Sequence, residues 1–138
     1  MTTGDHGART VLVQRVENGA VAAACLVAAV VLFPAWWWMP FALFLVFDLS
    51  ALGYLRSPRA GAVGYNLVHN YTAPAVLGGA ALIAASTGAT AAAAVVGLVA
   101  LSWAFHVAAD RALGYGLKFG DAFTHTHLGW IGRDRGVS

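Results

Sequence analysis

The chain has 138 residues, enough for one domain, and 59% of them are hydrophobic while only 10% are charged. Soluble domains carry about 25% charged residues, so a soluble fold of this length could not cover its surface, and we expect a membrane protein. The formal net charge of +2, without any basic cluster, argues against a nucleic acid partner. The single cysteine, Cys25, excludes a disulfide framework or a cysteine-based metal site and is interpreted as a small apolar filler.

Four stretches are apolar over about 20 residues, the length that an α-helix needs to cross a bilayer. We expect these spans at roughly residues 11–33, 35–55, 62–85 and 89–113. The remaining tail, residues 114–138, is too polar to cross.

Local signals set the ends of these spans. Pro34 ends the first, and the three consecutive rings of Trp36–Trp38 suit the headgroup level at the start of the second. Pro74 predicts a kink in the third span, and the segment 86–88 predicts a tight turn before the fourth. Gly114 is expected to cap the end of the fourth.

The basic residues are segregated to one side of this arrangement. Four spans place the N-terminus, the loop 56–61 and the tail on the same side. That side holds all eight lysines and arginines: Arg9, Arg15, Arg56, Arg59, Arg111, Lys118, Arg133 and Arg135. The positive-inside rule therefore places both termini in the cytoplasm. The sequence predicts an all-α fold, a four-transmembrane-helix bundle formed by the single domain 1–138 in the inner membrane, with the tail 114–138 cytoplasmic.

Each predicted span carries an ionisable side chain, although a charge at the centre of a membrane helix costs about 2.5–3.5 kcal/mol. These residues are Glu17, Asp48, His69, His106 and Asp110. At a rise of about 1.5 Å per residue, all five fall in the half of the bilayer nearer the basic loops. Polar groups that several helices bury at one level can share a site, and we expect a pocket that faces the cytoplasm.

Residue spacing adds detail to this pocket. His106 and Asp110 are four residues apart and share a helix face. In the tail, His125 and His127 are two residues apart, and this spacing does not decide whether both turn toward the bundle. The glycine-rich segment 114–120 would let the tail fold back under the helix ends. His6 and His125 are interpreted as ordinary exposed residues.

Several blocks of the sequence carry a family resemblance. They are Glu17, Asp48 with Tyr54, Tyr65-Asn66 with His69, His106 with Asp110-Arg111, the segment 114–118 and the segment 126–129. Together, over about residues 15–129, they resemble a small bacterial membrane family known as a domain of unknown function (DUF4260). The resemblance implies four helices in the membrane and favours His127 over His125 as the functional histidine. It implies no particular reaction.

The function that we expect first is a metal-dependent membrane enzyme. Imidazoles and carboxylates that converge at one depth suit Zn²⁺ or non-haem iron. The expected ligands are His69, His106 and His127. Asp48, Asp110 and Glu17 are the candidate catalytic acids or bases, and Asp48 or Asp110 could also be a metal ligand.

The substrate is expected to be a lipidic or amphiphilic small molecule from the bilayer. The candidate substrate-binding residues are the polar and aromatic side chains near the same depth: Tyr54, Tyr65, Asn66, Trp103, Arg111 and Lys118. Arg111 and Lys118 could hold an anionic headgroup or a phosphate.

Three other functions remain open on the sequence. The first is a metal-free acid–base cyclase or isomerase of isoprenoids, in which buried carboxyl groups donate protons and aromatic rings stabilise cations. The second is a proton or ion carrier. The third is a polar network that only holds helices together. The sequence does not indicate an oligomeric state.

Overall fold

The computed structural model describes residues 3–132, with side chains from residue 7 onward. The side chains of His6, Arg133 and Arg135 lie outside these described residues. Within them the fold is all-α apart from one short hairpin. The elements are α1 (Thr3–Leu32), α2 (Met39–Ala42), α3 (Phe44–Asp48), the 3₁₀ helix η1 (Leu49–Leu55), α4 (Pro58–Val68), α5 (Thr72–Ser86), α6 (Thr90–Leu113), β1 (His125–Thr126) and β2 (Gly129–Trp130).

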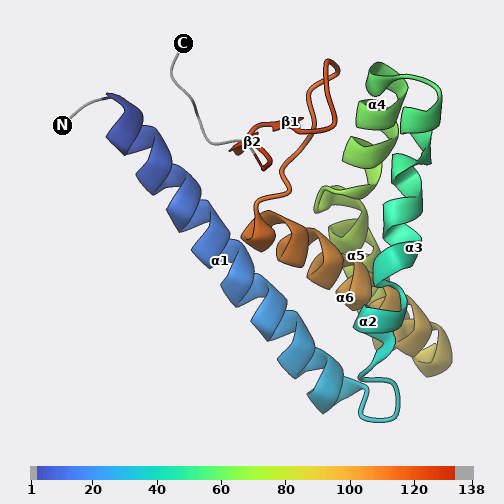
Figure 1. Cartoon of the computed structure of the whole chain (residues 1–138). Coiled ribbons are helices and arrows are strands. Elements are labelled where there is room, and N and C mark those ends of the chain that lie inside the picture. Colours follow the sequence, from blue (N-terminus) through green and yellow to red (C-terminus); the bar gives the residue numbers. More distant parts are fainter. Residues whose placement is uncertain (1–2, 133–138) are drawn as a thin grey trace.

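The helix α6 lies at the centre of the fold, with α1 along one side of it and the segments α2 and α3 along another (Figure 1). It contributes more of the buried side chains than any other element, from Leu98 to Asp110. Its end is capped by Gly114, whose φ of 101° is left-handed, as the sequence predicts. The turn before it contains Gly88 with a φ of 83°, which also confirms the expected break at 86–88.

The predicted second span is broken into three short helical pieces. Pro34 ends α1 as expected, but the following apolar helical region runs only from Met39 to Leu55. Its last part, η1, packs against α4 so closely that backbone atoms nearly touch. A Cβ added at Gly64 would lie 2.9 Å from the carbonyl oxygen of Ser50. This close approach between helices depends on small residues.

The predicted third span is interrupted between His69 and Tyr71, not at Pro74 itself. A proline ring inside a helix clashes with the carbonyl four residues earlier, which here belongs to Asn70. The Asn70 side chain stabilises the break. Its Nδ2 donates to the carbonyl oxygen of Asn66 at 2.7 Å, and its Oδ1 accepts from the Thr72 N–H at 2.8 Å. The interruption leaves His69 at the end of α4.

The tail folds back over the helix ends, as the glycine-rich segment predicts. β1 and β2 pair antiparallel, with His125 opposite Trp130, and they lie at the same end of the molecule as the start of α4 (Figure 1). An isolated bridge joins Lys118 to Thr126. The tail therefore closes one end of the helix assembly.

The outer surface is that of a membrane protein. Leu55 is 87% exposed and Leu82 is 75% exposed, and soluble monomers rarely gather so many large apolar groups on the surface. Within the described residues, three helices are long and apolar enough to cross a membrane, namely Gly7–Leu32, Pro58–Ser86 and Thr90–Leu113. They correspond to the first, third and fourth predicted spans.

The contact between η1 and α4 leads to a stability prediction. A Cβ at Gly61 would lie 2.1 Å from the Tyr54 ring, so Gly61→Ala must displace that ring. We expect this substitution to lower the free energy of unfolding in detergent by about 1–3 kcal/mol. Gly78→Ala is the matched control, because a Cβ there meets nothing within 4 Å. Equal unfolding midpoints for the two variants, followed by circular dichroism, would contradict the packing described.

Candidate functional site

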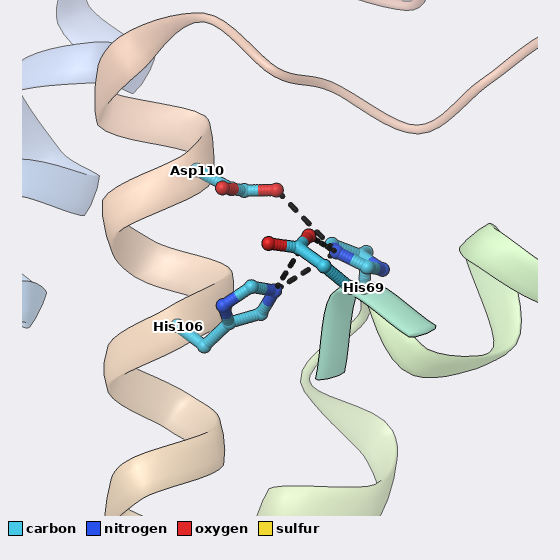
Figure 2. Close-up of side chains that lie close together, drawn as sticks. His69, His106 and Asp110 are labelled. Carbon is cyan, nitrogen blue, oxygen red and sulfur yellow. Dashed lines mark hydrogen bonds and ion pairs between the residues drawn. The ribbon is translucent and has the colours of Figure 1, made fainter. Parts of the chain in front are cut away.

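Four ionisable side chains from three helical segments converge near the closed end of the fold. Asp48 ends α3, His69 caps the end of α4, and His106 and Asp110 lie one turn apart on α6. We call these four residues the His/Asp cluster. Figure 2 shows His69, His106 and Asp110 pointing toward one another across the gap between α4 and α6.

His69 Nε2 lies close to all three other members of the cluster. It is 2.9 Å from His106 Nε2, 3.4 Å from Asp110 Oδ2 and 3.4 Å from Asp48 Oδ1. His106 Nε2 is also 3.7 Å from Asp48 Oδ1. The four donor atoms, one from each residue, all lie within 4.8 Å of one another. The structure therefore brings together residues that the sequence placed only at a common depth.

The tautomer of neutral His69 follows from its backbone contact. Its Nδ1 lies 2.9 Å from the carbonyl oxygen of Tyr65, which can only accept a hydrogen bond. Nδ1 must therefore carry the proton and donate it. A neutral His69 then turns an unprotonated Nε2 with a free lone pair toward the other three members of the cluster. Ser50 Oγ lies 3.4 Å from the same Nδ1.

Tyr65 holds two members of the cluster. Its hydroxyl donates a hydrogen bond to Asp110 Oδ2 at 2.7 Å. Its ring stacks on the imidazole of His69, with centroids 3.5 Å apart and planes at 9°. Tyr65 was predicted as a substrate-binding residue. Its contacts in the structure orient the cluster itself.

His106 is the most enclosed member of the cluster. Its side chain is fully buried and packs against the rings of Phe44 and Phe47, with centroid distances of 4.4 Å and 5.3 Å. Its Nδ1 has no hydrogen-bond partner. The apolar wall fixes the direction of the ring, so Nε2 faces the other members of the cluster.

A cavity of about 390 Å³ opens beside the cluster. Its walls include Asp48, Asp110 and Tyr65 together with apolar groups from α3, α6 and the tail, among them Phe44 and Leu113. The Asp48 side chain is 41% exposed, whereas His69 is 3% exposed. The cluster is thus buried on the imidazole side and accessible on the Asp48 side. This volume suits a small molecule.

The tail is anchored to α4 next to the cavity. Asn66 Nδ2 donates to the Lys118 carbonyl oxygen at 2.8 Å, and Asn66 Oδ1 accepts from the Lys118 N–H at 2.7 Å. The Asn66 side-chain amide thus bonds both the C=O and the N–H of Lys118, as a neighbouring β-strand would. Asn66, which was predicted to bind substrate, fixes the backbone of Lys118.

The Lys118 ammonium group is enclosed by aromatic rings. Its Nζ lies 4.1 Å from the ring centroid of Phe123, 4.8 Å from that of Tyr65 and 5.6 Å from that of Tyr115. Only 4% of the residue is exposed, and Nζ has no hydrogen-bond partner. Burial lowers the pKa of Lys118 to about 8, although the nearby charge of Asp110 acts in the opposite direction.

Trp103 and Arg111 contact the backbone around His69. Trp103 Nε1 donates to the Val68 carbonyl oxygen at 2.7 Å. An Arg111 Nη lies 3.5 Å from the His69 carbonyl oxygen, and its guanidinium group lies over the Tyr71 ring at 4.8 Å. Neither was predicted for this role, and both contacts hold the broken end of α4 against α6.

His127 and Glu17 are not among the residues that the structure groups together. His127 Nδ1 accepts the Leu117 N–H at 2.8 Å and so ties the two arms of the tail. Burial lowers the pKa of His127, and the charge of Arg111 adds to this effect, which favours the neutral form that such an acceptor needs. Glu17 is exposed on α1. The cluster therefore has two imidazoles where the sequence predicted three.

His125 has local partners of its own in the tail. Its Nδ1 lies 2.7 Å from Asp121 Oδ2, and its ring stacks on Trp130 with centroids 4.3 Å apart. Both partners lie in the tail and outside the His/Asp cluster, but the His125 side chain is only 30% exposed, so the residue is half-buried and not freely exposed as the sequence predicted.

The family model described as a domain of unknown function (DUF4260) matches residues 11–131. The chain belongs to this family. This DUF4260 protein has no significant match among curated proteins or among solved structures. The match confirms the resemblance seen in the sequence and assigns no activity.

Sequence reasoning missed two parts of the site in this DUF4260 protein. Ser50, beside His69 Nδ1, had no signal beyond lying two residues after Asp48. Tyr115 and Phe123, which line the cavity, lie in the tail, where only Lys118 and His127 were predicted as site residues. Aromatic residues interspersed with glycines in a polar tail were the available signal.

Proposed function

We propose that the chain is a small integral membrane enzyme that binds a transition metal at the His/Asp cluster and acts on an amphiphilic small molecule in the adjoining cavity. The observation that carries this proposal is the convergence of four donor atoms, from residues far apart in the sequence, within 4.8 Å of one another. Two neutral imidazoles and two carboxylates form a donor set that suits Zn²⁺ or Fe²⁺.

The distances within the cluster support a single ion. Donors about 2.0–2.1 Å from a tetrahedral ion lie about 3.3–3.4 Å from each other. The distances that involve His69 Nε2 are 2.9, 3.4 and 3.4 Å, and the distance between His106 Nε2 and Asp48 Oδ1 is 3.7 Å. Small side-chain rotations would bring these values to the tetrahedral spacing.

The charge of the cluster also supports a cation. Asp48 and Asp110 together carry two negative charges when ionised, and an imidazole binds a metal through its neutral form. A dication at the centre of the cluster would be attracted to both carboxylates. The Tyr65 hydroxyl, which bonds Asp110 Oδ2, would orient one of them.

The protein groups around the cluster suit catalysis more than a closed structural site. A bound metal would supply Lewis acidity or an activated water. Asp48 lies on the cavity side, where it is placed either to bind the ion or to accept a proton from a molecule in the cavity. The enclosing wall of Phe44 and Phe47 would exclude water from the imidazole side.

The apolar exterior of the chain supports a substrate that partitions into the bilayer. The cavity walls combine the two acids with Phe44, Leu113 and Phe123, a mixture that fits a molecule with an apolar body and a polar reacting group. This substrate class and the lipid bilayer are the partners that we propose.

The length of the second apolar region and the positions of the basic residues support a four-span topology with both termini in the cytoplasm. The region Met39–Leu55 is shorter than a usual span, but a 3₁₀ helix rises about 2.0 Å per residue instead of 1.5 Å. With η1 stretched in this way the region reaches about 30 Å, the thickness of the hydrocarbon core. The basic residues on the side of loop 56–61 and the tail favour a cytoplasmic location for that side.

A metal-free acid–base enzyme is the second candidate, and one contact favours it. The separation of 2.9 Å between the two Nε2 atoms is also that of a hydrogen bond, if His106 donates a proton to His69. Such a pair could relay a proton between Asp48 and Asp110 during a cyclisation or an isomerisation.

Metal analysis separates these two candidates. Tag-free protein purified without chelator is expected to contain roughly one zinc or iron ion per chain. His106→Ala and Asp48→Ala should each lose most of that metal, because each removes one ligand. His125→Ala and His127→Ala are the matched controls and should keep it, since both histidines have partners in the tail.

Each variant is first checked for helicity and for its unfolding midpoint. Trace metal in the wild-type protein that is the same in all four variants would exclude the metal enzyme and leave the acid–base candidate. Loss of metal from His127→Ala would show that His127 is a ligand, as the sequence predicted.

The topology predicts the behaviour of single-cysteine labelling sites. In a Cys25→Ala background, a cysteine placed at Arg56 should be protected from a membrane-impermeant maleimide in intact cells and should react after lysis. A cysteine at Ser86 should react in intact cells. The reverse pattern would invert the orientation, and reaction at both sites in intact cells would exclude four spans.

A further inference from the structure

Two buried hydrogen-bond donors next to the cavity have no acceptor. They are Lys118 Nζ and the Tyr54 hydroxyl, both of which are inaccessible to solvent and without a hydrogen-bond partner. A buried donor without an acceptor is destabilising, and a buried ammonium group more so. The aromatic rings around Lys118 offset part of this cost, but they do not replace a hydrogen-bond acceptor.

Phe123 packs against both the Lys118 ammonium group and the ring of Tyr54. Its ring centroid lies 4.1 Å from Lys118 Nζ and 5.2 Å from the centroid of the Tyr54 ring. Phe123 also lines the cavity, and 44% of its surface is exposed. An exposed ring on a tail segment can change rotamer at low cost. Its displacement would open a path from the cavity to the two residues that it covers.

The charge near these donors supports an anion. Asp110 is the acid whose charge acts on Lys118. Under the proposed function, a dication at the cluster cancels that charge. Lys118 would then remain as a buried cation without a hydrogen-bonded partner among the described residues. An anion in the cavity would neutralise it and accept hydrogen bonds from both donors.

We propose that Lys118 Nζ and the Tyr54 hydroxyl form an anion subsite for the carboxylate or phosphate end of the substrate, with Phe123 as the side chain that moves to admit it. The subsite and the cluster are joined by Tyr65. Its ring lies 4.8 Å from Lys118 Nζ, while its hydroxyl bonds Asp110 at 2.7 Å. A small molecule in the cavity can therefore reach both.

The assignment of the bound anion as part of a substrate rests on the proposed function. Binding of the anion itself can be measured without metal. We would titrate hexyl phosphate, hexanoate, inorganic phosphate and 1-hexanol into the protein in neutral detergent by calorimetry, both metal-free and after zinc loading. Hexyl phosphate and hexanoate should bind, and 1-hexanol should bind at least about tenfold more weakly. Inorganic phosphate that binds as tightly as hexyl phosphate would assign the subsite to free phosphate.

Three variants locate the binding. Lys118→Met keeps the apolar stem and removes the charge, and it should weaken hexyl phosphate binding about tenfold or more. Tyr54→Phe removes only the hydroxyl oxygen and should weaken binding severalfold. Arg56→Met removes the same charge from an exposed position on the same side of the protein and should leave binding unchanged.

The outcomes separate this proposal from the metal proposal. Wild-type protein that binds neither anion overturns the subsite, whatever its metal content. The proposal is also overturned if Tyr54→Phe and folded Lys118→Met both bind hexyl phosphate with the wild-type affinity. Anion binding that depends on Lys118 in a protein that never takes up metal keeps the subsite and rejects the metal enzyme.

Discussion

The hydrogen bond from His69 Nδ1 to the Tyr65 carbonyl oxygen decides what the rest of the cluster can do. Because that carbonyl can only accept, it fixes the proton of neutral His69 on Nδ1 and leaves Nε2 as a lone pair. The other three donor atoms gather around this nitrogen at 2.9–3.4 Å. The Tyr65 carbonyl oxygen also accepts the His69 backbone N–H at 2.8 Å, and α4 ends there because Pro74 disrupts the helix at Asn70.

The remaining elements hold this arrangement from several sides. α6 supplies His106 and Asp110 from its buried centre, and the wall of Phe44 and Phe47 sets the direction of the His106 ring. The tail returns through Asn66, which holds the backbone of Lys118. One surface of the cluster, around Asp48, stays open to a cavity. A site that is rigid on one side and accessible on the other is what a small-molecule enzyme requires.

Periodic features of the chain could be predicted from the sequence, and features that depend on irregular backbone could not. The pairing of His106 with Asp110 follows from their helical spacing, and depth counting was enough to bring Asp48 and His69 to the same level. The depth of a residue in the bilayer does not tell which side of its helix the side chain lies on. For this reason Glu17 was predicted as a site residue although its side chain is exposed on α1.

For similar reasons the sequence did not predict the contacts of Tyr65 and His127 or the division of the second span. The contact of the His69 ring with the Tyr65 carbonyl oxygen depends on a side-chain rotamer, which residue spacing does not give. His127 lies in a hairpin whose turn, and not its spacing, sets the direction of the ring, and that ring bonds the Leu117 N–H. The second span is divided into short helical pieces, and η1 packs closely on α4 through glycines, a contact between two helices that one helix's periodicity does not reveal.

The imidazoles of His69 and His106 meet the carboxylates of Asp48 and Asp110 around one centre. X-ray absorption spectroscopy of the zinc-loaded, tag-free protein tests this arrangement most directly. We expect a shell of about four nitrogen and oxygen neighbours at about 2.0 Å with the scattering pattern of two imidazoles, and of one imidazole in whatever zinc His106→Ala still holds. A spectrum without imidazole scattering, or one that His106→Ala leaves unchanged, would contradict the account.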